Sequence, residues 1–113
     1  MSVTNVFSAV ADPTRREMLD LLVARPRAAG EIVSHFSNLT QPGVSRHLRV
    51  LREAQLVSVT VRAQQRIYAL RSEGLHELHE WVSKYQEFWG DKMEAFEHHL
   101  DGKTVKHGAG KRK

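Results

Sequence analysis

Three polar side chains near the start of one predicted helix have the chemistry to hydrogen-bond to the edges of nucleic-acid bases. They are Gln41, Ser45 and Arg46, within the run Thr40-Gln41-Pro42-Gly43-Val44-Ser45-Arg46-His47-Leu48. Arginine pairs with guanine and glutamine with adenine through two hydrogen bonds each, and serine bonds to either base. These residue types predict a base-reading surface, provided that one helix presents all three side chains outward.

A helix that is capped by Thr40 and continues to Glu53 meets this condition. At 100° per residue its apolar side chains gather on one face: Val44, Leu48 and Leu51. Pro42 and the polar side chains lie opposite or on one flank, the polar ones being Gln41, Ser45, Arg46, Arg49 and Glu53. We expect Thr40 and Arg49 to contact phosphates. The alternative is that Arg46, Arg49 and Arg52 only form a solvated helix face.

Three helices are expected before this one. The first covers Val3 to Val10, and the second begins at Asp12-Pro13 because aspartate caps a helix and proline suits its first turn. Its apolar stripe ends before Arg25-Pro26. The third is short and ends near Ser37-Asn38. Two linked helices of this kind can pack at a steep angle, so that the second enters the major groove of DNA.

The pattern changes after Gln55 to one of alternating β-branched and aromatic residues. Residues 56–61 and 67–70 are predicted strands of a β-hairpin, separated by a polar stretch over residues 62–66. Its side chains are placed for contacts with the DNA backbone: Arg62, Gln64, Gln65 and Arg66.

A long helix is predicted from Ser72 to Leu100, with a kink or break expected at Gly90. Its apolar face is too wide for one packing partner. We therefore expect a dimer interface formed by aromatic residues of this helix and of the first one: Phe7, Trp81, Phe88, Trp89 and Phe96. A ligand pocket between the helices, or a surface for another protein, are the alternatives.

Charge is unevenly distributed along the chain. Residues 1–71 carry ten arginines and five acidic residues, for a net charge of +5, whereas residues 72–100 carry −5 and residues 101–113 carry +4. This asymmetry favours a polyanion as partner. We expect one domain over residues 1–100 and a basic, disordered tail over residues 101–113.

Several classes of protein are disfavoured by what the sequence lacks. It has no cysteine, no apolar run long enough to span a membrane and no signal-peptide pattern, so we expect a cytoplasmic protein without a membrane partner. No Gly-rich phosphate loop or nucleophile–base arrangement indicates an enzyme, and no cofactor is expected.

The expected fold is mainly α with a small β-hairpin, a winged helix-turn-helix of order α-α-α-α-β-β-α. The function that it favours is sequence-specific binding of double-stranded DNA by a transcriptional regulator. A protein-interaction or anti-regulator module with no operator of its own is the alternative hypothesis.

Residues 6–70 resemble the arsenic-repressor (ArsR) family of bacterial winged-helix regulators. The matching segments are Phe7–Arg16, Val44–Val57 and Arg66–Leu70, and residues 81–89 look like its metal-independent, autorepressor-like subgroup. The resemblance implies a homodimer joined by its first and last helices, a palindromic operator, repression, and base reading by Gln41, Ser45 and Arg46. It leaves open an unknown small-molecule or protein effector.

Two departures from the family pattern concern glycines. Gln55 stands where the family commonly has glycine, so that it must adopt a left-handed conformation or the turn must differ. The hairpin tip, Ala63-Gln64-Gln65, also lacks glycine, which disfavours a tight turn and predicts a longer or looser wing.

Histidines raise the question of a metal site, since many relatives sense metals. His76 and His79 are three residues apart and near Glu80, but a closed zinc site needs four ligands. We favour solvated histidines and predict no metal site. His47 lies beside the apolar helix face, where packing or a phosphate contact is the expected role.

Overall fold

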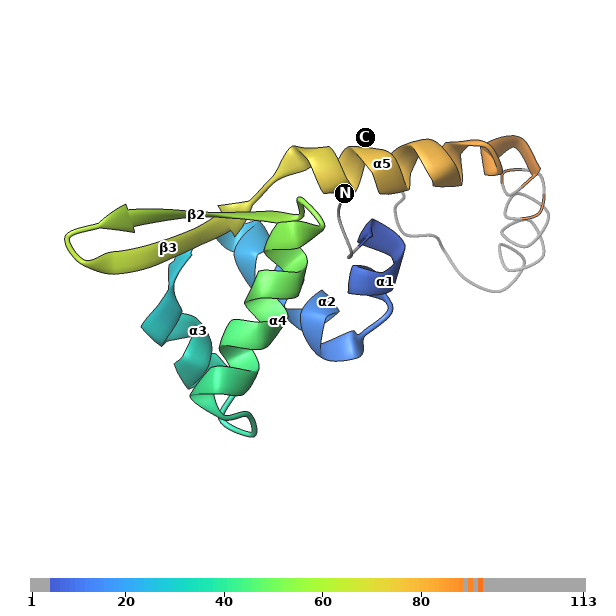
Figure 1. The fold of residues 1–113 in the computed structure, drawn as a ribbon. Coiled ribbons are helices and arrows are strands. Elements are labelled where there is room, and N and C mark those ends of the chain that lie inside the picture. Colours follow the sequence, from blue (N-terminus) through green and yellow to red (C-terminus); the bar gives the residue numbers. More distant parts are fainter. Residues whose placement is uncertain (1–4, 89, 91, 93–113) are drawn as a thin grey trace, which may run out of the picture. The chain divides into compact units, whose positions relative to one another are not determined.

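The structure is a computed structural model that describes residues 5–88, 90 and 92. The chain divides into two compact units, Met1–His79 and Glu80–Lys113. The elements along the chain are α1 (Val6–Val10), α2 (Pro13–Ala24), β1 (Arg27–Ala28), α3 (Ala29–His35), α4 (Gln41–Glu53), β2 (Val57–Arg62), β3 (Gln65–Leu70) and α5 (Ser72–Ser83) (Figure 1). This order confirms the winged helix-turn-helix expected from the sequence.

The first helices begin where capping side chains are available. Asn5 is extended and its side chain accepts a hydrogen bond from the Ser8 N–H, so α1 begins at Val6 rather than at Val3. Asp12 accepts from the Arg15 N–H at 3.0 Å and α2 follows at once with Pro13. That hydrogen bond is the main cause that lowers the pKa of Asp12.

The core of the first unit joins α1–α4 to the sheet. Its buried residues are Val6, Ala9, Met18, Leu19, Leu22, Ile32, Phe36, Val44, Leu48, Leu51, Ala54, Leu56, Val57 and Tyr68. The apolar face predicted for α4 is among them, as are Met18, Leu19 and Leu22 of the stripe predicted for α2, whereas Leu21 of that stripe is only partly buried. No charged side chain is buried among the described residues.

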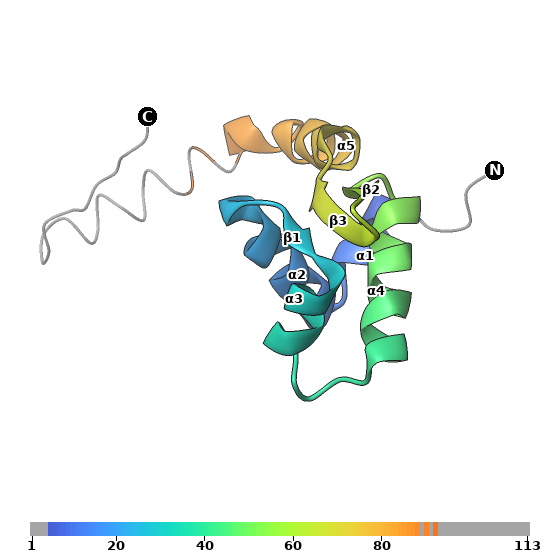
Figure 2. The same cartoon turned by 90° about the vertical axis from the view of Figure 1, so that its left-hand side faces the viewer.

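The sheet has three antiparallel strands in the order β1-β3-β2 (Figure 2). The strand β1 was not predicted, because its two residues are too short for an alternating pattern. It pairs Arg27 with Tyr68 and Ala28 with Ile67, and so ties the segment before α3 to the hairpin.

The prediction of a long or loose wing tip is wrong. Arg62 pairs with Gln65, which leaves a tight turn of Ala63 and Gln64 with φ values of 50° and 70°. Positive φ at both central residues is the geometry of the type I′ turn, whose twist matches that of the strands. The regular β2–β3 ladder thus holds two non-glycine residues in a conformation that costs each about 1–2 kcal/mol.

Gln55 takes the left-handed conformation that a family glycine would adopt, with φ of 64°. The Gln55 N–H donates to the Arg52 carbonyl and the Leu56 N–H to the Leu51 carbonyl. This pair of hydrogen bonds is a Schellman motif, which satisfies carbonyls at the end of α4 and turns the chain into β2.

The prediction of one continuous helix after Ser72 is wrong at Lys84. The helix α5 ends at Ser83, residues 84–85 form a turn, and helix resumes at residues 86–88. The amide groups of Lys84 and Tyr85 donate to carbonyls three residues earlier, which tightens the last turn and ends the helix. Gly90, where a kink or break was expected, is helical.

Candidate nucleic-acid interface

The start of α4 is fixed by its cap. Thr40 Oγ1 accepts a hydrogen bond from the Gly43 N–H at 3.1 Å, and a Cβ at Gly43 would lie 3.2 Å from the same oxygen. The Thr40 hydroxyl oxygen therefore accepts a hydrogen bond within the helix, while its O–H is still able to donate to a phosphate. Gln41 is exposed as the first residue of α4.

The helix α4 buries one face and presents the other to solvent. Val44, Leu48 and Leu51 are at most 2% exposed, as the helical periodicity predicted. The side chains of Ser45, Arg46 and Arg49 are exposed. The inner face therefore fixes the direction in which the polar side chains point.

A hollow of about 380 Å³ lies between the outer side of α4 and strand β3. Its lining residues are Pro42, Ser45, Arg46, Arg49, Arg52, Arg66 and Tyr68. We call it the arginine groove, because four of the seven residues are arginines and none is acidic. It brings together Ser45, Arg46, Arg49 and Arg66 from the predicted site, and adds Arg52 and Tyr68.

The remaining predicted wing residues lie away from this groove. Arg62 and Gln65 pair with each other next to the pair of Val61 and Arg66, so their side chains leave the opposite face of the hairpin. Gln64 lies in the exposed turn. Arg62, Gln64 and Gln65 can therefore contact a phosphate only if the hairpin tip itself approaches the DNA.

The structure separates the arginines of residues 1–71 into two equal groups. Five bond through their side chains to backbone carbonyls, a carboxylate or a histidine: Arg15, Arg16, Arg25, Arg27 and Arg71. Within the described residues, the other five form no hydrogen bond or ion pair with a carbonyl or carboxylate: Arg46, Arg49, Arg52, Arg62 and Arg66. All of the second group belong to α4 and the hairpin.

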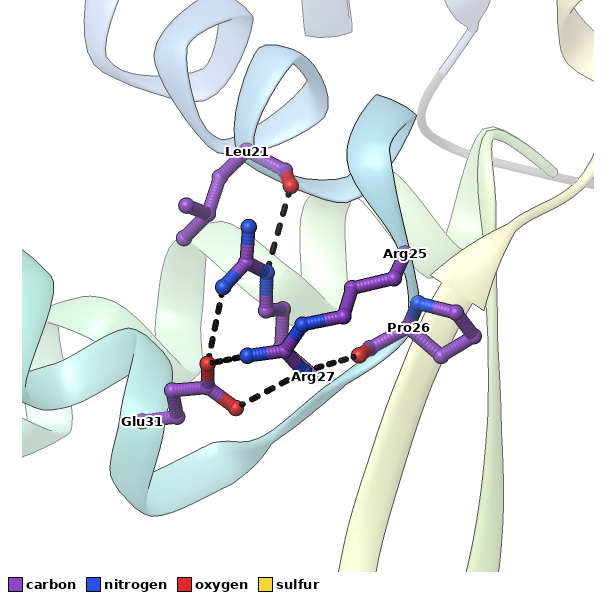
Figure 3. Close-up of polar contacts among 5 residues, drawn as sticks. All are labelled: Leu21, Arg25, Pro26, Arg27 and Glu31. Carbon is purple, nitrogen blue, oxygen red and sulfur yellow. Dashed lines mark hydrogen bonds and ion pairs between the residues drawn. The ribbon is translucent and has the colours of Figure 1, made fainter.

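Figure 3 shows the contacts that two arginines of the first group make within the chain. Arg27 Nη1 donates to Glu31 at 2.8 Å and its Nε to the Leu21 carbonyl at 3.3 Å. Arg25 also pairs with Glu31, and donates to the Pro26 carbonyl at 3.0 Å. The hydrogen bonds from Arg27 and then Arg25 lower the pKa of Glu31. This network braces the approach to α3 rather than a binding surface.

His47 has a structural role on α4. Its Nδ1 lies 3.2 Å from Arg15 Nη1, and Arg15 also donates to the Ala9 carbonyl at 2.8 Å. Because a guanidinium group only donates, His47 Nδ1 must be the acceptor in this contact. Arg15 therefore links α4 to the end of α1, a connection that sequence periodicity has no means of showing.

The residues predicted for a dimer interface fall in both units. Phe7 is 39% exposed on α1, and Trp81 and Phe88 are 46% and 65% exposed in the second unit. The rings of Trp81 and Tyr85 lie 5.4 Å apart, and Lys92 Nζ lies 5.3 Å from the centre of the Phe88 ring. Trp89 and Phe96 lie outside the described residues, as does the predicted tail.

In the described part of the chain, no three histidine, aspartate or glutamate side chains gather as a metal ion would need, and His76 and His79 are exposed. No helix of the same part is long and apolar enough to cross a membrane.

Several known proteins with similar sequences or structures are named as regulators of transcription. A helix-turn-helix domain family matches residues 10–60. The transcriptional repressor SdpR of Bacillus subtilis is 37% identical over 83 residues, which cover 74% of this chain and 91% of SdpR.

Two solved structures show the same arrangement of elements. One, described as a possible transcriptional regulator for arsenical resistance, is 30% identical with a TM-score of 0.69, over 82% of this chain and 96% of that one. The ArsR family transcriptional regulator RHA00566 is 27% identical with a TM-score of 0.67, over 75% and 87% of the two chains. The chain is thus a DNA-binding regulator of transcription and not an enzyme, and it belongs to the ArsR family of winged helix-turn-helix proteins.

Proposed function

We propose that this protein is a homodimeric repressor that binds a palindromic operator through α4. The observation that carries the proposal is the arginine groove, where four arginines gather without a carboxylate. Phosphates are the abundant charges of DNA, and neutralising them supplies much of the binding affinity. A relative named as a transcriptional repressor supports repression as the outcome of binding.

Base reading is assigned to the N-terminal half of α4. Ser45 and Arg46 lie on its exposed side, and Gln41 precedes Ser45 by one turn, so that the two side chains lie along one line of the helix. Arg46 has the fork geometry that recognises guanine. Arg49, Thr40 and Arg66 then lie where phosphates flank the groove, and Arg62, Gln64 and Gln65 contact the backbone that the wing tip reaches.

The dimer is proposed because each unit exposes large apolar side chains. Leu75 is 39% exposed on α5, and Val82, Tyr85 and Phe88 are exposed in the second unit. Aromatic residues such as Tyr85 and Phe88 are enriched at protein interfaces. A two-fold dimer presents two copies of α4, so that its operator should consist of two inverted half-sites. As a regulator of transcription, it would act in the cytoplasm of a bacterium.

The test of specificity is selection of bound duplexes from a random library, with and without added zinc. We expect two inverted half-sites and the same sequence in both conditions. Recovery of duplexes with no shared sequence would overturn the operator, and would favour the protein-interaction module instead. A shared sequence that is recovered only with zinc would show that the protein needs a metal effector.

The dimer needs a separate test, for which light scattering of the purified chain is suitable. Phe88→Glu should shift the mass from dimer toward monomer. Val23→Glu is the matched control, since Val23 is 69% exposed on α2, outside the proposed interface. A wild-type chain that is monomeric with and without its operator would contradict the proposal.

A further inference from the structure

Arg52 lies in the last turn of α4, where the sequence assigned it no contact of its own. It is half-buried, and it lines the arginine groove together with Arg66 of β3. Neither side chain forms an ion pair within the described residues. Two cations without a carboxylate partner that line one hollow from different elements favour an anion between them.

We infer that Arg52 and Arg66 together hold one phosphate of the DNA backbone, which passes between the end of α4 and strand β3. This inference rests on the proposed function. Guanidinium groups suit the site because each presents several N–H donors in a plane, and phosphate oxygens accept from two such groups at once.

The length of α4 explains why Arg52 meets a phosphate and not a base. Seven residues separate Ser45 from Arg52, which is about 10 Å along a helix at 1.5 Å per residue. The major groove is about 12 Å wide. When the N-terminal half of α4 reads base edges, its last turn therefore lies near the wall of the groove, where a strand's phosphates lie.

The electrostatics of the helix end favours the same assignment. The C-terminus of a helix carries a partial negative charge, which repels phosphate. Arg52 is the basic residue in the last turn of α4 and offsets this charge. Without it, the DNA strand would face the negative end of the helix at this point.

Tyr68 acts as a positioning residue for Arg66. The two side chains lie on the same face of β3, and Arg66 Nε is 3.5 Å from Tyr68 Oη. Tyr68 is 7% exposed and is paired on both sides, with Arg27 of β1 and Val59 of β2. A rigid tyrosine thus directs a flexible arginine toward α4, and leaves the other N–H groups of Arg66 free for an anion.

The first experiment measures DNA affinity against salt concentration for the full chain and the duplex selected above. Arg52→Ala and Arg66→Ala should each weaken binding severalfold without changing the preferred sequence. A shared phosphate predicts that the double variant lowers the salt slope by about one contact in total. A loss of two contacts would mean two separate phosphates and would overturn the inference.

Matched variants separate charge from folding. Arg52→Lys keeps the charge at the helix end and should retain most of the salt slope. Arg71→Ala removes an arginine that is paired with Glu73 outside the groove, and should leave binding unchanged. Tyr68→Phe should weaken binding in the wild type but not in Arg66→Ala, since it acts only through Arg66. An equal effect in both backgrounds would overturn the role of Tyr68.

A second experiment identifies the phosphate itself. Duplexes in which one phosphate at a time is replaced by a neutral methylphosphonate should reveal a position that weakens wild-type binding. At that position the substitution should cost little in Arg52→Ala and in Arg66→Ala. If no position behaves in this way while the wild type still binds its operator, the shared phosphate is wrong. If the wild type binds no duplex, the proposed function itself fails.

Discussion

Two hollows of similar size border α4 and carry opposite charge. The arginine groove has a volume of about 380 Å³ and four arginines in its lining. The second hollow, of about 350 Å³, is lined by Asn5, Val6, Glu53, Ala54, Gln55, Glu73, Gly74 and Glu77. We call it the glutamate corner. The groove follows the outer side of α4, whereas the corner lies at its C-terminal end.

The arginine groove is suited to binding a partner, whereas the glutamate corner contributes to folding. The arginines of the groove lack carboxylate partners in the described part of the chain, and are placed for an external anion. At the glutamate corner the backbone packs on itself: the Gly74 N–H donates to the Gln55 carbonyl at 2.8 Å and the Arg71 N–H to the Leu56 carbonyl. The positive charge of the arginine groove and the negative charge of the glutamate corner also favour one orientation of α4 toward a polyanion.

The largest expected effect is on folding at the glutamate corner. A Cβ at Gly74 would lie 2.7 Å from the Ala54 carbonyl oxygen and 2.8 Å from that of Gln55. Gly74→Ala should therefore lower the free energy of unfolding by about 3 kcal/mol, as overpacking against backbone does. Urea denaturation measures this loss. Gly30→Ala is the control, since its Cβ would meet nothing within 4 Å, and it should unfold no earlier than wild type.

The next effect concerns the arginine groove and leaves folding intact. Arg46→Ala should cost about 2 kcal/mol in discrimination at one base step of the operator, because a bidentate contact is lost. Competition binding with operators that differ at single positions measures it. Equal weakening for every operator variant would assign Arg46 to the backbone and contradict base reading.

A smaller effect, this time a gain in stability, is expected at Gln55, the residue of the glutamate corner with positive φ. Gln55→Gly should raise the free energy of unfolding by about 0.5–1 kcal/mol, because glycine adopts positive φ without steric cost. Gln65→Gly is the matched control in β3, where it should destabilise by a similar amount. A loss of stability in Gln55→Gly would show that the side chain, not the backbone, matters at this turn.

The smallest effect is a dependence of stability on pH at the same corner. Its own backbone N–H, followed by Arg71, lowers the pKa of Glu73. The stabilisation is therefore present above the ordinary glutamate pKa and is lost as pH falls through the lower folded value. Glu73→Gln should unfold slightly earlier than wild type at pH 7, and this difference should shrink as the pH falls through the folded pKa of Glu73. If the difference in stability between Glu73→Gln and wild type did not change with pH, ionisation of Glu73 would not contribute to folding.

Much of the fold could be predicted because it depends on local signals. Asp12 and Thr40 cap helices in the structure as their sequence positions indicate, and the inner face of α4 follows from its periodicity. The wing tip was mispredicted because tertiary contacts override local preference there. Ala63 and Gln64 are poor choices for a tight turn, yet the ladder of β2 and β3 holds them in one.

The candidate site divides in the same way. Gln41, Ser45 and Arg46 could be chosen from residue type and helical spacing, because those properties are written in the sequence. Arg52 could not be chosen, since its place in the groove depends on how the β2–β3 hairpin lies beside α4.

The sequence by itself thus determined the helices, their apolar faces and an excess of arginine in the first 71 residues. Only the tertiary structure decided which arginines remain available to a partner. Charge counts add every arginine equally, whereas folding pairs Arg25 and Arg27 with Glu31 and turns Arg15 toward His47. The other five, which form no ion pair within the described residues, lie on α4 and the hairpin.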